Sequence, residues 1–226
     1  VNVTENSATI SWDAVADSYT VLMNGSEISV IDTTYTFTDL MPMTQYTIGV
    51  AANCGSSLGL TAEISFSTSA IPAMLPYATG FEAGEDAGWL FVNGGNAWIT
   101  GSATSVNGSN ALYVSNDNGV SNSYTNSQSA ISYAYRTISI DAAGSYAVSF
   151  DWKSVGESNY DYMRAWLAPA NFQFIANLLP NGSTSTYSYT TTTPAGWYDL
   201  GGKMNLFDSW QNNHQVVSIA EAGNYN

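Results

Sequence analysis

Short runs of alternating apolar and polar residues, separated by turn residues, are the feature that most limits how this chain can fold. In the first 69 residues six such runs can be counted, at the spacing of roughly 8 to 12 residues that is typical of β-sandwiches. A period of two places alternate side chains on one face of a strand, so each run predicts a half-buried β-strand. The inward positions are Ala8, Ile10, Trp12, Tyr19, Val21, Met23, Tyr35, Phe37, Tyr46, Ile48, Val50, Ala52, Ile64 and Phe66.

The stretch YTFTDLMPMTQYTIGV, residues 35–50, shows how two of these strands are connected. Leu40 closes one strand over the core, Pro42 fixes the crossing turn, and the hydroxyl of Tyr46 can reach back to bond the turn backbone. This arrangement is a tyrosine corner. Asn24-Gly25 accepts positive φ at low cost, so it predicts a hairpin between two of the other strands.

Residues 1–69, through Trp12 and the segment Leu40–Tyr46, resemble the fibronectin type III domain. Most of the family's first strand should precede Val3, so we expect that strand to be largely missing. The segment VAANCGSS resembles the version of this module found in secreted proteins of Bacteroidetes, which implies an extracellular source.

Composition limits the partners of the chain. It has 226 residues, a length that suggests two domains. Its 18 acidic and 4 basic side chains give a net charge of −14, so its surface is expected to repel phosphate. Nucleic acid is therefore not expected as a partner, and no apolar run is long enough for membrane insertion. The single cysteine, Cys54, excludes an internal disulfide and is expected to be buried.

The run SAIPAMLP, with two prolines and no alternation, predicts a stiff linker at residues 70–76. Residues 77–226 then alternate again, for example at Val148, Phe150 and Trp152, with long loops rich in Asn and Gly. An all-β chain is predicted, a fibronectin type III sandwich followed by a jelly-roll β-sandwich.

Residues 77–226 resemble the choice-of-anchor J and cleaved-adhesin (MAM-like) jelly-roll domains of Bacteroidetes surface proteins. That family usually closes with further strands, which would be missing here, so the chain is interpreted as part of a larger modular protein. Strand exchange with a neighbouring molecule is the alternative. The resemblance rests on Gly80–Glu82, Gly88-Trp89, Ala97–Ile99, Ala111–Asp117, Ala134–Arg136, Phe150–Lys153 and Asp161–Arg164.

No catalytic pattern stands out. His214, the only histidine, lies in the polar run WQNNHQ and is interpreted as a loop residue, and neither a nucleophile elbow nor a zinc motif occurs. The chain is therefore predicted not to be an enzyme.

Several carboxylates lie in loops and have few basic partners. They suggest a structural calcium ion, because calcium is coordinated by oxygen atoms. The jelly-roll resemblance implies a calcium near Glu82, and Asp117 is the second ligand candidate. The alternative is that these acids are solvated surface residues.

Several tryptophans could form a stacking surface for sugar rings. Trp152 alternates with Phe150 and is assigned to the interior, whereas Trp166 and Trp197 are predicted to be exposed and to bind ligand. Arg136 and Lys153 are expected to pair with a carboxylate or stack on a ring.

Three functions remain open. The first is a non-catalytic adhesion or binding segment of a secreted or cell-surface protein, whose partners would be a glycan or a host extracellular protein and further domains of the same polypeptide. The second is an accessory module of a secreted hydrolase or peptidase. The third is a subunit of a surface filament completed by strand exchange.

Overall fold

The computed structural model describes residues 1–55, 57–184 and 193–226, and these residues form strands, turns and loops but no helix. The all-β prediction is confirmed. It follows that no described helix could cross a lipid bilayer. The chain divides into two compact units, Val1–Ile71 and Pro72–Asn226, which we call the first and second units.

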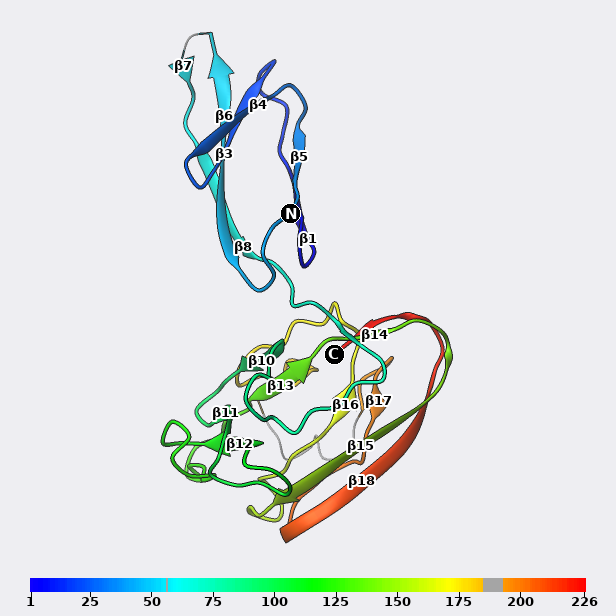
Figure 1. The fold of residues 1–226 in the computed structure, drawn as a ribbon. Coiled ribbons are helices and arrows are strands. Elements are labelled where there is room, and N and C mark those ends of the chain that lie inside the picture. The colour runs from blue at the N-terminus through cyan, green and yellow to red at the C-terminus, as the bar shows by residue number, and fades with distance from the viewer. Residues whose placement is uncertain (56, 185–192) are drawn as a thin grey trace. The chain divides into compact units, whose positions relative to one another are not determined.

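The first unit is a sandwich of two antiparallel sheets (Figure 1). One sheet has the order β1-β2-β5. The other has the order β4-β3-β6-β7, with β8 also pairing with β6. The strands are β1 (Asn2–Val3), β2 (Ala8–Ser11), β3 (Tyr19–Met23), β4 (Ser26–Val30), β5 (Thr34–Phe37), β6 (Gln45–Cys54), β7 (Ser57–Leu58) and β8 (Ala62–Ser67).

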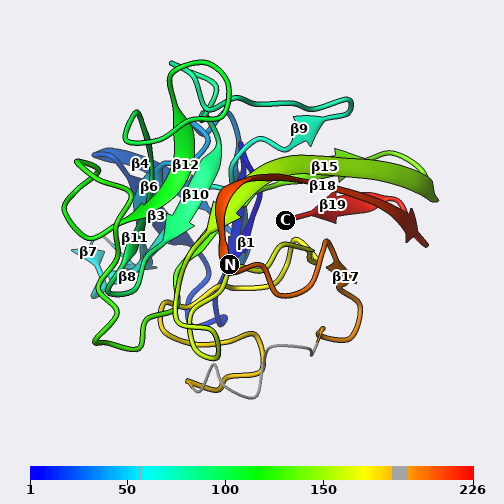
Figure 2. The ribbon, with the colours of Figure 1, turned by 90° about the horizontal axis from the view of Figure 1, so that it is seen from below.

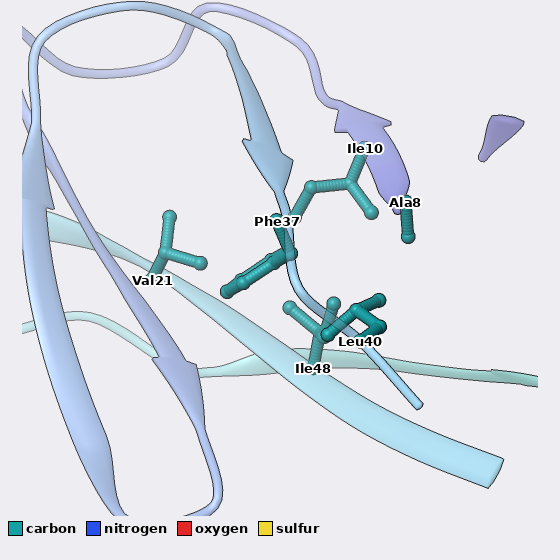
Figure 3. Close-up of a cluster of buried hydrophobic side chains, with 6 residues drawn as sticks. All are labelled: Ala8, Ile10, Val21, Phe37, Leu40 and Ile48. Atoms are coloured by element: carbon teal, nitrogen blue, oxygen red, sulfur yellow. The ribbon is translucent and has the colours of Figure 1, made fainter. Parts of the chain in front are cut away.

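The core of the first unit comes from the alternating residues of facing strands. Figure 3 shows the six buried side chains converging between the sheets: Ala8, Ile10, Val21, Phe37, Leu40 and Ile48. Ala8, Val21 and Ile48 are completely buried. Trp12 packs against this cluster and meets Tyr19 edge to face, with ring centroids 5.5 Å apart.

Both local turn predictions are confirmed. The backbone N–H of Met41 donates to the Tyr46 hydroxyl at 2.8 Å, which is the bond of a tyrosine corner. Asn24 and Gly25 both have positive φ, 52° and 81°, and they connect β3 to β4 with Met23 opposite Ser26. Positive φ at both central residues gives a turn whose twist matches that of the flanking strands.

The second unit contains several separate sheets, most of them with only two strands. The pairs are β10-β13, β11-β12, β15-β18 and β16-β17, together with a three-stranded sheet β19-β14-β9. The strands are β9 (Ala73–Met74), β10 (Trp89–Val92), β11 (Ala97–Gly101), β12 (Ala111–Ser115), β13 (Tyr133–Arg136), β14 (Ile138–Ile140), β15 (Gly144–Ser154), β16 (Trp166–Leu167), β17 (Tyr198–Asp199), β18 (Phe207–Ile219) and β19 (Gly223–Tyr225).

Both strands of the long β15-β18 ribbon contribute side chains to the second core. Figure 2 shows its two strands curving side by side, and their register runs from Gly144 opposite Ile219 to Ser154 opposite Phe207. Alternate side chains of β15 turn inward onto a buried cluster. That cluster consists of Ile140, Leu167, Leu200, Val217 and Ile219.

Three expectations need correction. Residues 70–76, expected as a linker, contain β9, which pairs in parallel with β14 and therefore lies within the second unit. Cys54 is exposed rather than buried, because it lies at the outer end of β6 opposite Ser57 of the short strand β7. His214 lies in β18 opposite Ser149 rather than in a loop, because polar residues continue the strand on its solvent face.

The rare basic residues in strands stack on aromatic rings, as expected. The guanidinium of Arg136 lies 5.9 Å from the ring centroid of Tyr77, and Nζ of Lys153 lies 5.0 Å from that of Trp210. Each cation is attracted to the negative face of the ring over which it lies.

Candidate binding groove

The two tryptophans predicted to bind ligand do come together. Trp166 in β16 and Trp197 in the turn before β17 meet edge to face, with ring centroids 5.6 Å apart and planes at 78°. Trp197 also meets Phe172 edge to face at 4.9 Å. Both indole rings are half-buried rather than exposed, because neighbouring rings cover them.

These contacts belong to a larger aromatic cluster. Phe174 lies 5.1 Å from Phe172, 4.9 Å from Tyr133 and 4.6 Å from Tyr135, measured between ring centroids. Edge-to-face contacts turn neighbouring rings across one another, so Trp166 and Trp197 do not form one flat stacking surface. Their role in ligand binding stays a prediction, and the geometry assigns them first to packing.

An ion pair connects the Arg164 side chain, which lies over Trp166, to Asp199 at the end of β17. The guanidinium of Arg164 lies 4.8 Å from the Trp166 ring centroid and pairs with the carboxylate of Asp199. The Arg164 side chain is only 2% exposed, and its Nη2 also donates to Thr193 Oγ1 at 3.3 Å. Such a buried cation is committed to the fold rather than available to a ligand.

The pKa of Asp199 reflects this position. Burial raises it, but the backbone N–H groups of Gly202 and Gly201 and the charge of Arg164 outweigh burial, so the pKa is lowered overall. The two N–H groups donate to Asp199 Oδ1 at 2.7 and 3.0 Å. Asp199 therefore stays ionised and holds the turn that follows β17.

Beside the aromatic cluster lies an open groove of about 520 Å³, which we call the Tyr198–Tyr225 groove. Its lining includes the sequence neighbours of two cluster residues, because Gly196 and Tyr198 flank Trp197 and Asn171 precedes Phe172. The lining comes from two backbone segments and the end of the turn before β17: Pro169, Ala170, Asn171, Gly196, Tyr198, Ala220, Glu221, Ala222, Gly223, Asn224 and Tyr225.

Two tyrosine rings and three polar side chains give this groove its chemistry. The rings of Tyr198 and Tyr225 meet edge to face, 6.3 Å between centroids. The side chains of Asn171, Glu221 and Asn224 belong to exposed residues of the lining. Apolar ring surface with a few polar groups around it is the usual composition of a small-molecule site.

Backbone contacts hold the two phenols in place. The Tyr225 hydroxyl donates to the Glu221 carbonyl oxygen at 2.9 Å, and the Ala220 N–H donates to the Tyr198 hydroxyl at 3.4 Å. Burial raises the pKa of Tyr225, and Tyr198 and the Glu221 charge add to the rise. The Tyr225 phenol is therefore neutral at neutral pH.

This groove was not predicted from the sequence. Tyr198 and Tyr225 are 27 residues apart, and neither stands in a motif. They meet because β19 returns to pair with β14 while Asn226 exchanges two backbone hydrogen bonds with Ala168, next to β16. Pairing between distant segments of this kind leaves no signal in a local pattern.

The first predicted calcium ligand, Glu82, secures a loop instead. Its Oε1 accepts backbone N–H groups from Ser109 at 2.7 Å and Asn110 at 2.9 Å. These bonds, that from Asn110 most, lower the pKa of Glu82. The Glu82 carboxylate thus holds loop 105–110 in place by accepting hydrogen bonds from its backbone N–H groups.

Asp117, the second predicted ligand, bonds its own turn. Its Oδ2 accepts the Ser121 hydroxyl at 2.6 Å, and its Oδ1 accepts the Ser115 hydroxyl at 2.7 Å and the Ser121 N–H at 2.9 Å. The Ser121 hydroxyl, then the other donors, lower the pKa of Asp117 to about 2. Both oxygens are already used by protein donors.

Neither Glu82 nor Asp117 belongs to a larger group of potential metal ligands in the part of the chain that the structure describes. Within residues 1–55, 57–184 and 193–226 no group of three or more His, Cys, Asp or Glu side chains is placed to hold a metal. The calcium prediction stays a prediction without geometric support.

Comparison with known proteins agrees with the first unit. Residues 1–67 match the family model of the fibronectin type III domain. That match covers the whole first sandwich from β1 to β8, and the choice-of-anchor J resemblance of the second unit stays a prediction. The comparison with curated proteins finds no match.

Two solved structures show weak similarity to the whole chain. The chitinase ChiA74 from Bacillus thuringiensis is 11% identical with a TM-score of 0.28, and the match covers 98% of this chain and 26% of that one. This chain thus spans about a quarter of that chitinase. A structure titled as a study of the promiscuous specificity of carbohydrate-binding modules of the β-sandwich superfamily is 14% identical with a TM-score of 0.29, covering 99% and 90%. Both TM-scores are too low to indicate a shared fold.

Proposed function

We propose that the second unit binds a glycan in the Tyr198–Tyr225 groove, without catalysis, and that the fibronectin type III unit accompanies it as a further module of a secreted or cell-surface protein. The observation that carries the proposal is the composition of the groove. It combines two aromatic rings with exposed amide and carboxylate side chains in an open groove of about 520 Å³.

Sugar rings suit such a surface for two reasons. Their C–H faces lie against aromatic rings, which offer apolar area, and their hydroxyls need both donors and acceptors. The Asn171 and Asn224 side chains each supply both kinds of group, and the exposed Glu221 supplies an acceptor. Openness suits a chain-like ligand, which can enter and leave along the groove.

This proposal keeps two of the functions left open by the sequence. An adhesion segment and an accessory module of a hydrolase or peptidase both need a binding surface, and they differ in the glycan bound and in the rest of the polypeptide. A host protein as the ligand and strand exchange in a filament stay predictions.

The proposal is tested by glycan-array screening of the full chain, followed by calorimetric titration of the best glycan. Asn171→Ala should weaken binding about fivefold, because an amide that bonds a sugar hydroxyl contributes about 1 kcal/mol. Asn171 is exposed, so the fold should survive its loss.

Asn159→Ala is the matched control, since Asn159 is also exposed but does not line the groove, and it should leave binding unchanged. Failure of every glycan to bind, or equal weakening by the two variants, would contradict the proposal.

A further inference from the structure

The Tyr198–Tyr225 groove has a one-sided charge. Its lining includes one carboxylate, Glu221, and no Lys, Arg or His. The whole sequence has only four Lys and Arg residues against 18 acids. A ligand in this groove therefore meets negative charge at short range from Glu221 and at long range from the molecule.

Each of the four Lys and Arg residues lies over an aromatic ring outside the groove lining. Arg164 lies over Trp166 and pairs with Asp199, while Lys203 lies 5.4 Å from the Tyr162 ring centroid. Arg136 and Lys153 lie over Tyr77 and Trp210. None of these cations lines the groove, so none can neutralise Glu221 there or receive an acidic sugar.

Glu221 lines the same groove as Tyr198 and Tyr225. The hydroxyl of Tyr225 donates to the Glu221 carbonyl oxygen at 2.9 Å, which holds the residue that carries the carboxylate beside the tyrosines. A cation that enters between a carboxylate and tyrosine rings gains both an ion pair and a cation–π contact. A neutral amide in the same position gains neither.

We infer that the groove selects amine-bearing saccharides, in which a protonated amino group lies against Glu221 and the Tyr198 and Tyr225 rings, over N-acetylated and acidic ones. This inference rests on the proposed function and names its ligand class. Glu221 sets the selectivity, and the tyrosines and amides hold the sugar.

The experiment compares three probes with the full chain at low ionic strength: a glucosamine oligomer with free amines, the N-acetylglucosamine oligomer of the same length, and a galacturonic acid oligomer. We expect the free-amine oligomer to bind about tenfold more tightly than the acetylated one, and the acidic one to bind more weakly than either. Raised salt should reduce the difference, because the charges are exposed.

Glu221→Gln and Glu157→Gln separate the groove from the overall charge. Both remove one negative charge from an exposed residue, but Glu157 does not line the groove. Glu221→Gln should lower affinity for the free-amine oligomer about threefold and leave the acetylated oligomer unchanged. Glu157→Gln should change neither.

Two results would overturn the inference and spare the proposed function: equal affinity for the free-amine and acetylated oligomers, or equal effects of the two variants. Failure of all three probes and of every other glycan to bind would instead remove the proposed function itself.

Discussion

The two units of this protein use the same strand pattern but secure it in different ways. In the first unit, six buried side chains from facing sheets meet in one compact cluster, and hairpins connect neighbouring strands. In the second unit, the sheets are mostly two-stranded, and carboxylates and amides fasten the long loops between them. The difference teaches that one alternating core accounts for most of the first sandwich, whereas the second also depends on carboxylate and amide side chains that bond the backbone of its loops.

Asn205 illustrates the second mode. It is 7% exposed, and its Nδ2 donates to the carbonyl oxygens of Gly156 and Glu157, both at 3.3 Å, and also to that of Asp161. One buried amide thus holds the whole loop that follows β15. An apolar residue there would leave those carbonyls without their donor.

The largest effect should follow truncation of the first core. Phe37 is 4% exposed within the cluster, so Phe37→Ala should lower the free energy of unfolding of the first unit by about 3–5 kcal/mol, through lost burial and a cavity. Hydrogen exchange in urea, resolved by segment, should show the loss within residues 1–71 alone. Phe207→Ala, at a residue 48% exposed in the second unit, is the control and should have a much smaller effect. Loss of protection in both units from Phe37→Ala would mean that they are not independent.

A smaller effect should follow removal of the tyrosine-corner hydroxyl. Tyr46→Phe keeps the ring but leaves the Met41 N–H without its acceptor, at a cost of about 1 kcal/mol to the first unit. Chemical denaturation measures it. Tyr35→Phe is the control, because the Tyr35 hydroxyl makes no hydrogen bond with the described residues. An equal effect of both substitutions would argue against a corner that stabilises through this bond.

The smallest effect is expected from acidification. The pKa values of Glu82, Asp117 and Asp199 are all lowered by bonds in the second unit, that of Asp117 from 3.8 to about 2. A folded-state pKa below the unfolded one contributes stability at neutral pH that is lost as pH falls through the folded value. Between about pH 5 and pH 2 we therefore expect the loops at 105–121 to gain hydrogen exchange before the first unit does.

Ser121→Ala sharpens this test. It removes the strongest donor to Asp117, so the loop around 117 should open at higher pH than in the parent protein. Asp208→Asn, at an exposed carboxylate of β18, should not move the transition. If the first unit lost protection from hydrogen exchange at a higher pH than these loops, the second unit would not be the more acid-sensitive of the two.

Much of the first unit could be predicted from sequence, because its determinants are local. Alternation correctly predicted the buried positions Ala8, Ile10, Val21, Phe37 and Ile48. The turn at Asn24-Gly25 could be predicted from the preference of these two residues for positive φ. The exception is Ile64, which is 44% exposed on the edge strand β8, where no further strand continues the sheet beyond it among the described residues.

The second unit was harder for a physical reason. Whether a loop carboxylate binds a cation or the backbone depends on which distant N–H groups come within reach, and Glu82 meets Ser109 and Asn110 only after the chain has folded. Whether a tryptophan is exposed depends in the same way on rings such as Phe172 that arrive from another segment.

The sequence alone determined that this chain is built of strands, because a period of two in side-chain polarity can be satisfied only by extended backbone with one buried face. It also determined the tyrosine corner and the β3–β4 hairpin, which depend on neighbouring residues. Tertiary structure decided the groove, because Tyr198, Glu221 and Tyr225 meet only when β19 returns to β14, and contacts between segments so far apart arise from the packing of the whole unit.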